Sequence, residues 1–313
     1  MLHLRAVCPP DQTAEAVEIL RAHSGVAHLV VHHGVAVKPG GDLIEADIAR
    51  ESTDEIVDSL CGLQLDRTGG ITLETIETAL SDAADKAEED APGEGADAVV
   101  WQELLGRTGE ESRLNVTFLA FLAIACLLAA VGIVTDSPVT IVGAMVVGPE
   151  FGPLAAIAVG LVLRRGDLVR RAAVALGIGF PVAMLVTLGA TLLAEATGLF
   201  AASDLIGEHQ VDFIYQVGPY ALIVALLAGA AGMLSMTSAK SAALVGVFIS
   251  VTTVPAAGYA VVAAVLGEWD RCLSSAGQLV VNLIGIVLAA AIVLIFRRNK
   301  QRSDVAQRPL SQG

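Results

Sequence analysis

The most constraining feature of this sequence is a series of long apolar segments between Asn115 and Phe296. A helix that crosses a lipid bilayer needs about 20 predominantly apolar residues in a row. Six segments meet that requirement, at residues 115–135, 138–163, 168–195, 217–238, 241–266 and 274–296. The chain is 54% hydrophobic and only 17% charged, whereas soluble domains average about 25% charged residues. We therefore predict an α-helical integral membrane bundle with six spans.

Basic residues fall almost entirely on one side of these predicted spans. Eleven of them precede span one, separate spans two and three or spans four and five, or follow span six: Arg107, Arg113, Arg164, Arg165, Arg170, Arg171, Lys240, Arg297, Arg298, Lys300 and Arg302. On the opposite side only Arg271 occurs. Because Lys and Arg are retained on the cytoplasmic side, we expect a multi-pass protein of the bacterial inner (plasma) membrane with both termini in the cytoplasm.

The first 80 residues have the composition of a soluble domain. Strands are predicted at 2–9, 25–34, 42–50 and 69–77, and helices at 13–23 and 52–63. This order, βαββαβ, is that of an α+β ferredoxin-like domain. In the third strand Ile44, Ala46 and Ile48 alternate with polar residues and should face the core. We expect Thr13 or Asp11 to cap the first helix, and Ser52 with Glu55 to form a capping box on the second.

The sequence therefore predicts four parts. Residues 1–80 form the cytoplasmic ferredoxin-like domain, and residues 81–113 form an acidic linker or frayed helix followed by an amphipathic interfacial helix. In that helix Val99, Leu104 and Leu105 face the membrane surface and Trp101 is an anchor. The membrane domain occupies residues 114–298. A basic and polar cytoplasmic tail follows at 299–313.

Composition also bears on partners and chemistry. Residues 1–100 contain 20 acidic and 6 basic residues and so carry the whole net charge of −14, which argues against nucleic acid as a partner. His28 and His32 should share one face of the second strand and His33 the other. We treat them as histidines of an exposed sheet and expect no metal and no cofactor. The sequence contains no HExxH, GxSxG or phosphate-cradling glycine loop, so we expect no catalytic residues and no enzyme.

One acidic residue, Glu150, lies in the middle of the second predicted span, in the stretch GAMVVGPEFGPL. It is surrounded by Gly148, Pro149, Gly152 and Pro153, and each proline should free the backbone carbonyl one turn before it. An ionised carboxylate at the bilayer centre costs at least about 2.5 kcal/mol on insertion scales. Glu150 should therefore face the bundle interior, be protonated or meet a cation. It is either a proton or cation site on a transport path or a protonated structural bond to a neighbouring helix.

The second and fifth predicted spans resemble each other. Val142-Gly143 matches Val245-Gly246, and Pro149 and Gly152 match Pro255 and Gly258. Each copy is the middle one of three spans, so the two copies would run in opposite directions. This predicts a 3+3 inverted repeat whose Pro/Gly-broken helices meet near the midplane, as in many transporters. Chance similarity between Gly- and Pro-containing membrane helices is the alternative. Other polar candidates for the same path are Thr252, Thr253, Lys240 and Asn282.

At these motifs the chain resembles a family of prokaryotic membrane proteins, domain of unknown function 389 (DUF389). The resemblance rests on the stretch from Asp136 to Leu161, on the stretch from Ser241 to Trp269, and on Asn282. It covers roughly residues 99–296. The family pattern usually has an apolar residue where this chain has Glu150, so a mechanism built on Glu150 would belong to a subgroup. The resemblance implies an integral membrane protein and supplies no substrate.

We therefore expect a transporter or channel for a small solute or ion, with or without proton coupling, whose soluble domain regulates or assembles it. Its predicted partners are the lipid bilayer, the solute or ion, and further copies of the chain in a homo-oligomer. The alternative is a non-transporting membrane sensor or scaffold whose soluble domain binds a small ligand.

Overall fold

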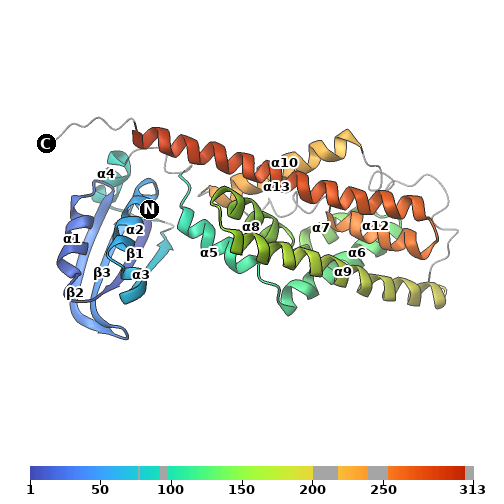
Figure 1. Cartoon of the computed structure of the whole chain (residues 1–313), viewed down its shortest axis with the longest axis horizontal. Helices are drawn as coiled ribbons and strands as arrows, with labels where there is room; N and C mark the ends of the chain where they lie inside the picture. Colours follow the sequence, from blue (N-terminus) through green and yellow to red (C-terminus); the bar gives the residue numbers. More distant parts are fainter. Residues whose placement is uncertain (77, 92–97, 200–217, 239–252, 307–313) are drawn as a thin grey trace. The chain divides into compact units, whose positions relative to one another are not determined.

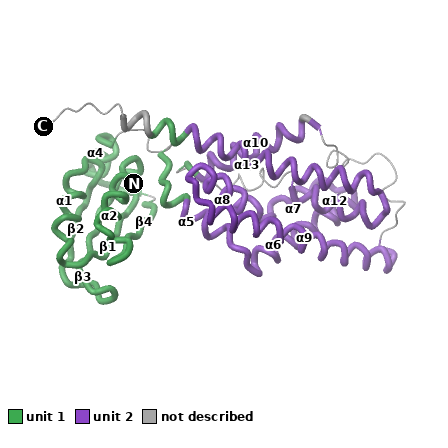
Figure 2. Tube along the Cα trace, in the orientation of Figure 1, with its two compact units in different colours: residues 1–104, 237–239, 297–313 green, residues 105–236, 240–296 purple. Residues whose placement is uncertain are grey.

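The computed structural model describes residues 1–76, 78–91, 98–199, 218–238 and 253–306. It divides into two compact units (Figure 2). Unit 1 contains residues 1–104, 237–239 and 297–313, and unit 2 contains residues 105–236 and 240–296. The fifth span is predicted at residues 241–266, and the structure describes this range only from Thr253 onward.

Unit 1 is built on a four-stranded antiparallel sheet. Its strands are β1 (Leu2–Cys8), β2 (Val26–Val37), β3 (Gly40–Ile48) and β4 (Gly70–Thr75), in the spatial order β2-β3-β1-β4. The alternating residues of β3 that the sequence assigns to the core, Ile44, Ala46 and Ile48, are fully buried. They face the same side as Leu4 and Ala6 of β1, because Leu4 pairs with Ala46 and Ala6 with Ile44. The predicted order βαββαβ is confirmed.

The helices of unit 1 are α1 (Thr13–Ala22), the 3-10 turn η1 (Arg50–Ser52), α2 (Thr53–Gly62), α3 (Leu65–Thr68) and α4 (Asp82–Asp90) (Figure 1). Neither predicted cap forms its side-chain hydrogen bond, although Ser52 does occupy the N-cap position of α2. Gln12 is the N-cap of α1, and the Thr13 hydroxyl instead donates to Asp42 at 2.8 Å. Ser52 is buried at the end of η1 in helical conformation and makes no side-chain cap, whereas a capping serine adopts extended backbone.

The histidines of the sheet pair with carboxylates of β3. His28 Nδ1 lies 2.6 Å from Asp47 Oδ2, and His33 Nδ1 lies 3.0 Å from Asp42 Oδ2. Asp47 and Asp42 point to opposite sides of β3, and His32 lies 3.5 Å from Glu45, which is on the same side as Asp47. His28 and His32 therefore share one face of the sheet and His33 lies on the other, so the predicted division is confirmed. Within the described ranges no group of three or more His, Cys, Asp or Glu is placed to hold a metal ion.

Unit 2 is helical. Its described helices are α5 (Trp101–Glu111), α6 (Val116–Val134), α7 (Pro138–Val147), α8 (Phe151–Val162), α9 (Gly166–Ala196), α10 (Pro219–Thr237), α12 (Thr253–Val265) and α13 (Trp269–Ala306). Parts of α5 and α13 and the last residue of α10 belong to unit 1. By length and composition α6, α9, α10 and α13 could each cross a membrane, and the bent pair α7–α8 could add a fifth span. The structure therefore contains four or five helices long and apolar enough for a membrane bundle among its described residues, and the six spans and the inverted repeat stay predictions.

The predicted interfacial helix differs from the prediction because protein covers two of the side chains that were expected to face the membrane. Val99 and Leu104 are 1% and 3% exposed, and Gln301 of α13 donates to the Val99 carbonyl and accepts from Trp101 Nε1 within unit 1. The tail predicted after residue 298 continues α13 as helix to Ala306 (Figure 1), since its Arg, Lys and Gln residues are good helix formers.

The helices of unit 2 approach closely where small residues face each other. The core contains Phe118, Leu122, Leu154, Phe180 and Ile286 together with many alanines. At Gly229 of α10 an added Cβ would lie 2.4 Å from the Ile286 carbonyl oxygen of α13. Small residues at such crossings are typical of helices that pack in membranes.

We predict that Gly229→Ala destabilises unit 2, because the new methyl group meets backbone atoms that cannot rotate away. The cost should be about 1–3 kcal/mol, as for other overpacked cores. Thermal unfolding of the purified protein in detergent measures it. Gly189→Ala in α9 is the matched control, since a Cβ there meets nothing within 4 Å; equal melting temperatures for the two variants would contradict the predicted contact.

A second prediction concerns Asp54 of α2, which accepts a hydrogen bond from the Trp101 backbone N–H at 3.0 Å. Burial raises the pKa of Asp54 to about 6 from 3.8. The folded state therefore binds this proton more tightly than the unfolded state, so unit 1 loses stability as the pH rises from about 4 through 6. Asp54→Asn, which can still accept the Trp101 bond, should restore on the order of 2–3 kcal/mol at pH 7.5 and little at pH 4.

Hydrogen exchange of α2 peptides in the full-length protein measures this effect at each pH. Asp66→Asn, on the exposed part of α3, is the control. If the protection gained by Asp54→Asn is the same at pH 4 and pH 7.5, burial does not set the charge of Asp54.

Candidate functional site

The break at Glu150 is built by the residues on either side of it. α7 ends at Val147, and its C-cap Gly148 is extended, with φ −65° and ψ 124°, which is the conformation that a following proline imposes. Pro149 has no N–H to continue the helix. Glu150 is then the N-cap of α8, and the axes of α7 and α8 differ by 53°. The predicted interruption of this apolar segment is confirmed.

Pro153 does not act as the sequence predicts. It is the third residue of α8, whose first hydrogen bond runs from Leu154 N–H to the Glu150 carbonyl. The first turn of a helix has no intrahelical acceptors for its N–H groups, so a proline there removes no bond. The segment is therefore broken once, at Gly148–Pro149, and Pro153 stabilises the new start instead of adding a second break.

The Glu150 carboxylate is completely buried and meets a residue far away in the chain. Thr253 Oγ1 donates to Glu150 Oε1 at 2.5 Å, and both side chains are 0% exposed. Thr253 is the first residue of α12 as described, and Pro255 is its third residue, the position that Pro153 has in α8. The structure thus brings together the two motifs that the sequence singles out. Thr252 and Lys240 lie outside the described residues.

Gly152 allows a further charged group to approach. A Cβ on Gly152 would lie 2.6 Å from Glu111 Cβ, so α8 can pack against the end of α5 only with glycine at this position. Glu111 forms an ion pair with Arg107 at 3.2 Å. This pair was not predicted from the sequence, although an i,i+4 spacing of opposite charges beside a predicted span could have indicated it.

Asn282 belongs to a buried polar stripe on α13. Gln278 Nε2 donates to Asn282 Oδ1 at 2.9 Å, and both side chains are buried together with Ser275. The spacing of these three residues places them on one helix face. Ser275 and Gln278 were not among the predicted site residues. A role of Asn282, or of the Gly148–Pro153 segment, on a transport path stays a prediction.

The electrostatic situation of Glu150 follows from this geometry. Complete burial disfavours its charged form, whereas its position at the start of α8 and the bond from Thr253 favour it. A carboxyl group under two opposing influences of this kind can exchange a proton or serve as the counter-charge of a cation.

Comparison with known proteins agrees with the predicted family. Residues 145–288 match the family described as "Domain of unknown function (DUF389)". The chain is 22% identical over 214 residues to an uncharacterised protein of Methanocaldococcus jannaschii. That similarity covers 66% of this chain and 62% of the relative, so the chain spans less than two thirds of the relative's length. No solved structure matches. The matched residues contain Glu150, Thr253, Pro255 and Asn282, so the similarity to DUF389 includes the motifs on which the resemblance rests.

Proposed function

We propose that this protein is a membrane transporter or channel for a small solute or ion, and that Glu150 and Thr253 lie on its path. The observation that carries the proposal is the buried hydrogen bond between these two residues, at the starts of α8 and α12. We also propose that the protein lies in the bacterial inner membrane with both termini in the cytoplasm. It forms a homo-oligomer, and it transports its solute or ion and catalyses no reaction.

The first support is the cost of this arrangement in an apolar helix bundle. A polar or ionisable group inside a membrane protein is expensive and is generally associated with a path for ions, protons or solutes. A structural hydrogen bond could be made by two neutral residues at lower cost. Retaining a carboxyl group here is explained if its charge or proton is used.

The second support is the interrupted backbone. At Gly148–Pro149 the helix gives up its regular hydrogen bonds, and non-helical backbone at membrane depth is tolerated only where protein or a water-filled cavity surrounds it. Interrupted helices that meet at a substrate or ion site are a recurring feature of transporters. Unit 1, with its acidic surface and α/β sheet, then regulates or assembles the membrane part.

We predict that Glu150→Gln abolishes proton-coupled flux while leaving the protein folded, because Gln can still accept the Thr253 bond and cannot carry a charge. Proton movement into proteoliposomes, reported by an enclosed pH dye under an imposed K⁺ gradient with valinomycin, should fall by more than about tenfold, the usual scale for loss of a proton-transfer group. Glu195→Gln, an exposed acid in the last turn of α9, is the control. Unchanged pH-dependent flux in Glu150→Gln would remove the proton site.

A second prediction needs no knowledge of the substrate. In a cysteine-free background, Thr253→Cys should react with a small water-soluble thiosulfonate because solute and water reach the path. Ala257→Cys, one turn further along α12 and equally buried in the hydrophobic core, should not react. Mass spectrometry of the labelled protein in liposomes measures both rates. If both cysteines react at equal and negligible rates, the contact between Glu150 and Thr253 is dry and only structural. That result together with an absence of flux would favour the sensor or scaffold.

A further inference from the structure

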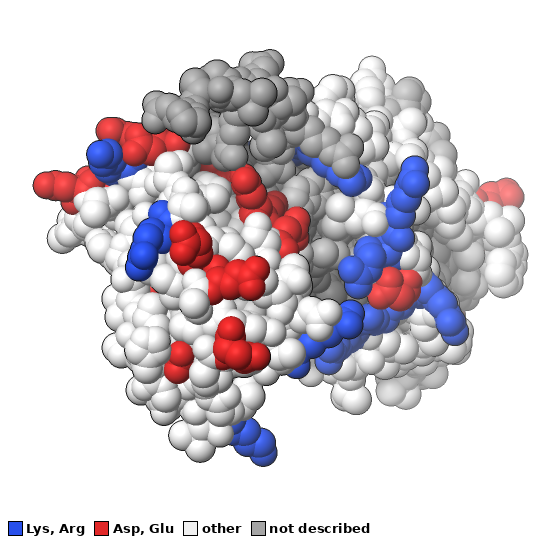
Figure 3. Space-filling model, turned by 60° about the vertical axis from the view of Figure 1, so that its left-hand side comes forward, with Lys and Arg blue, Asp and Glu red and all other residues white. Residues whose placement is uncertain are grey.

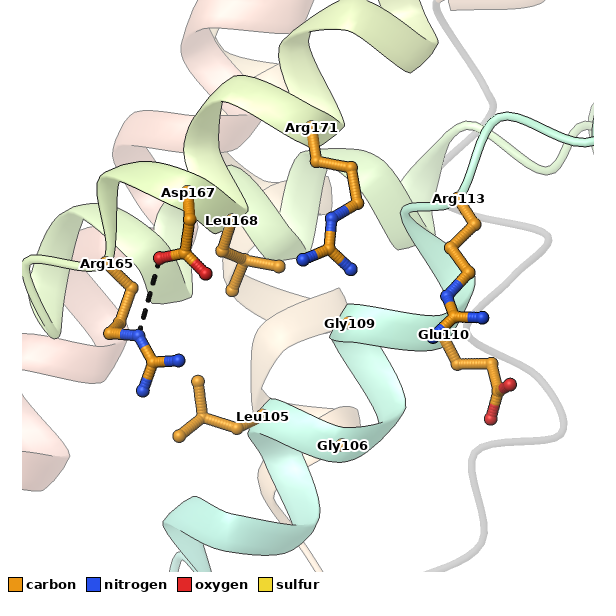
Figure 4. A pocket seen from close by; sticks show the side chains of 9 residues that line it. All are labelled: Leu105, Gly106, Gly109, Glu110, Arg113, Arg165, Asp167, Leu168 and Arg171. Carbon is orange, nitrogen blue, oxygen red and sulfur yellow. Dashed lines mark hydrogen bonds and ion pairs between the residues drawn. The ribbon is translucent and has the colours of Figure 1, made fainter.

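A second polar feature of unit 2 lies at the turn between α8 and α9, apart from Glu150. A pocket of about 280 Å³ is lined by Leu105, Gly106, Gly109, Glu110, Arg113, Arg165, Asp167, Leu168 and Arg171 (Figure 4). Three arginines thus line it from two segments: Arg113 lies just after α5, and Arg165 and Arg171 lie at the start of α9. On the face drawn in Figure 3, Lys and Arg side chains gather together and most acidic side chains lie apart from them.

The arginines of this pocket are only partly neutralised by protein groups. Arg165 Nε lies 3.5 Å from Asp167 Oδ1, whereas no ion pair of Arg113 or Arg171 occurs with any carboxylate of the described chain. In Figure 4 the guanidinium groups of Arg165 and Arg171 point toward the face of α5 that bears the two glycines. Three arginines against Glu110 and Asp167 leave the lining with a net positive charge.

Two glycines of α5, Gly106 and Gly109, line the pocket at positions where packing against other residues does not require glycine. A Cβ on Gly106 or Gly109 would meet nothing within 4 Å, although glycine inside a helix is less favourable than alanine. These two glycines share one face of α5. Their missing side chains keep open the space toward which the arginines point.

The turn that carries Arg165 has a second arginine, Arg164, in the left-handed backbone conformation, which is strained for a residue other than glycine. Arg164 has φ 56°, and the bonds Arg164 N–H to Leu161 O and Arg165 N–H to Gly160 O close the end of α8. The ends of α9 and α12 are closed by the same pair of bonds, with Gly198 and Gly267 at the left-handed residue. Glycine is the favoured residue there, and Arg164 does not line the pocket.

We propose that this pocket binds a phosphate group, carried by an anionic phospholipid headgroup or by a free phosphate compound. Planar guanidinium groups such as those of Arg165 and Arg171, which face the glycines of α5, match phosphate oxygens in geometry and charge. The pocket lies at the ends of apolar helices, beside Leu105 and Leu168, which is where lipid headgroups meet a membrane protein, and basic pockets at helix ends recognise such headgroups. This site is independent of the proposed transport path.

The test uses the full-length protein in detergent, with native mass spectrometry counting bound dioleoyl phosphatidylglycerol against dioleoyl phosphatidylcholine. We expect preferential binding of the anionic lipid. Each of Arg113→Gln and Arg171→Gln should weaken it about fivefold. Asp167→Asn should strengthen it by a similar factor, because it releases Arg165. All of these side chains are exposed, so the variants should fold.

Two further variants separate a built pocket from general charge. Arg164→Gly removes a neighbouring positive charge at a position that favours glycine, and it should leave binding unchanged. Gly109→Leu fills the pocket without changing its charge, and it should abolish binding. Inorganic phosphate that competes with the lipid, with the same dependence on Arg113 and Arg171, would identify a free phosphate as the ligand. The proposal is overturned if Arg171→Gln and Gly109→Leu bind like the wild type, or if Arg164→Gly weakens binding as much as Arg171→Gln does.

Discussion

The hydrogen bond from Thr253 to the buried carboxyl group of Glu150 is the interaction on which the interpretation of unit 2 depends. It joins residues 103 positions apart and connects the start of α8 to the start of α12. Burying a carboxyl group at the interruption costs free energy unless it is hydrogen-bonded, and Thr253 supplies such a bond from a distant segment. The contact therefore explains why a chain with so few charges keeps one at this position.

Other buried polar side chains of unit 2 also form hydrogen bonds within the protein. Gln278 and Asn282 bond to each other along α13, and the Thr187 and Thr191 hydroxyls return to carbonyls of α9. Those bonds are local and could form in an isolated helix. The bond between Glu150 and Thr253 cannot, since it requires two distant segments to fold together. This dependence on tertiary structure distinguishes the bond between Glu150 and Thr253 from the local hydrogen bonds within α9 and α13.

Much of the fold could be predicted because it follows from local patterns. The alternation of apolar and polar residues predicted that Ile44, Ala46 and Ile48 lie in the core of unit 1. The βαββαβ order followed from the succession of strand-like and helix-like spacings of apolar residues along the chain. The break at Pro149 followed from a missing N–H. The capping bonds predicted for Thr13 and Ser52 do not form, because the Thr13 hydroxyl bonds to Asp42 of β3 and Ser52 has helical backbone at the end of η1. Glu111 was missed for the same reason, since only packing against Gly152 makes it a neighbour of the break.

The sequence by itself determined the apolar helices, the α/β order of unit 1, the position of the interruption and the resemblance to DUF389, because these depend on the identity and spacing of neighbouring residues. Tertiary structure alone decided that Thr253 is the partner of Glu150, that Val99 and Leu104 are covered by protein, and that arginines from α5 and α9 line one pocket. The physical reason is that burial and pairing between distant segments depend on how helices approach each other, and periodicity along one segment carries no information about that approach.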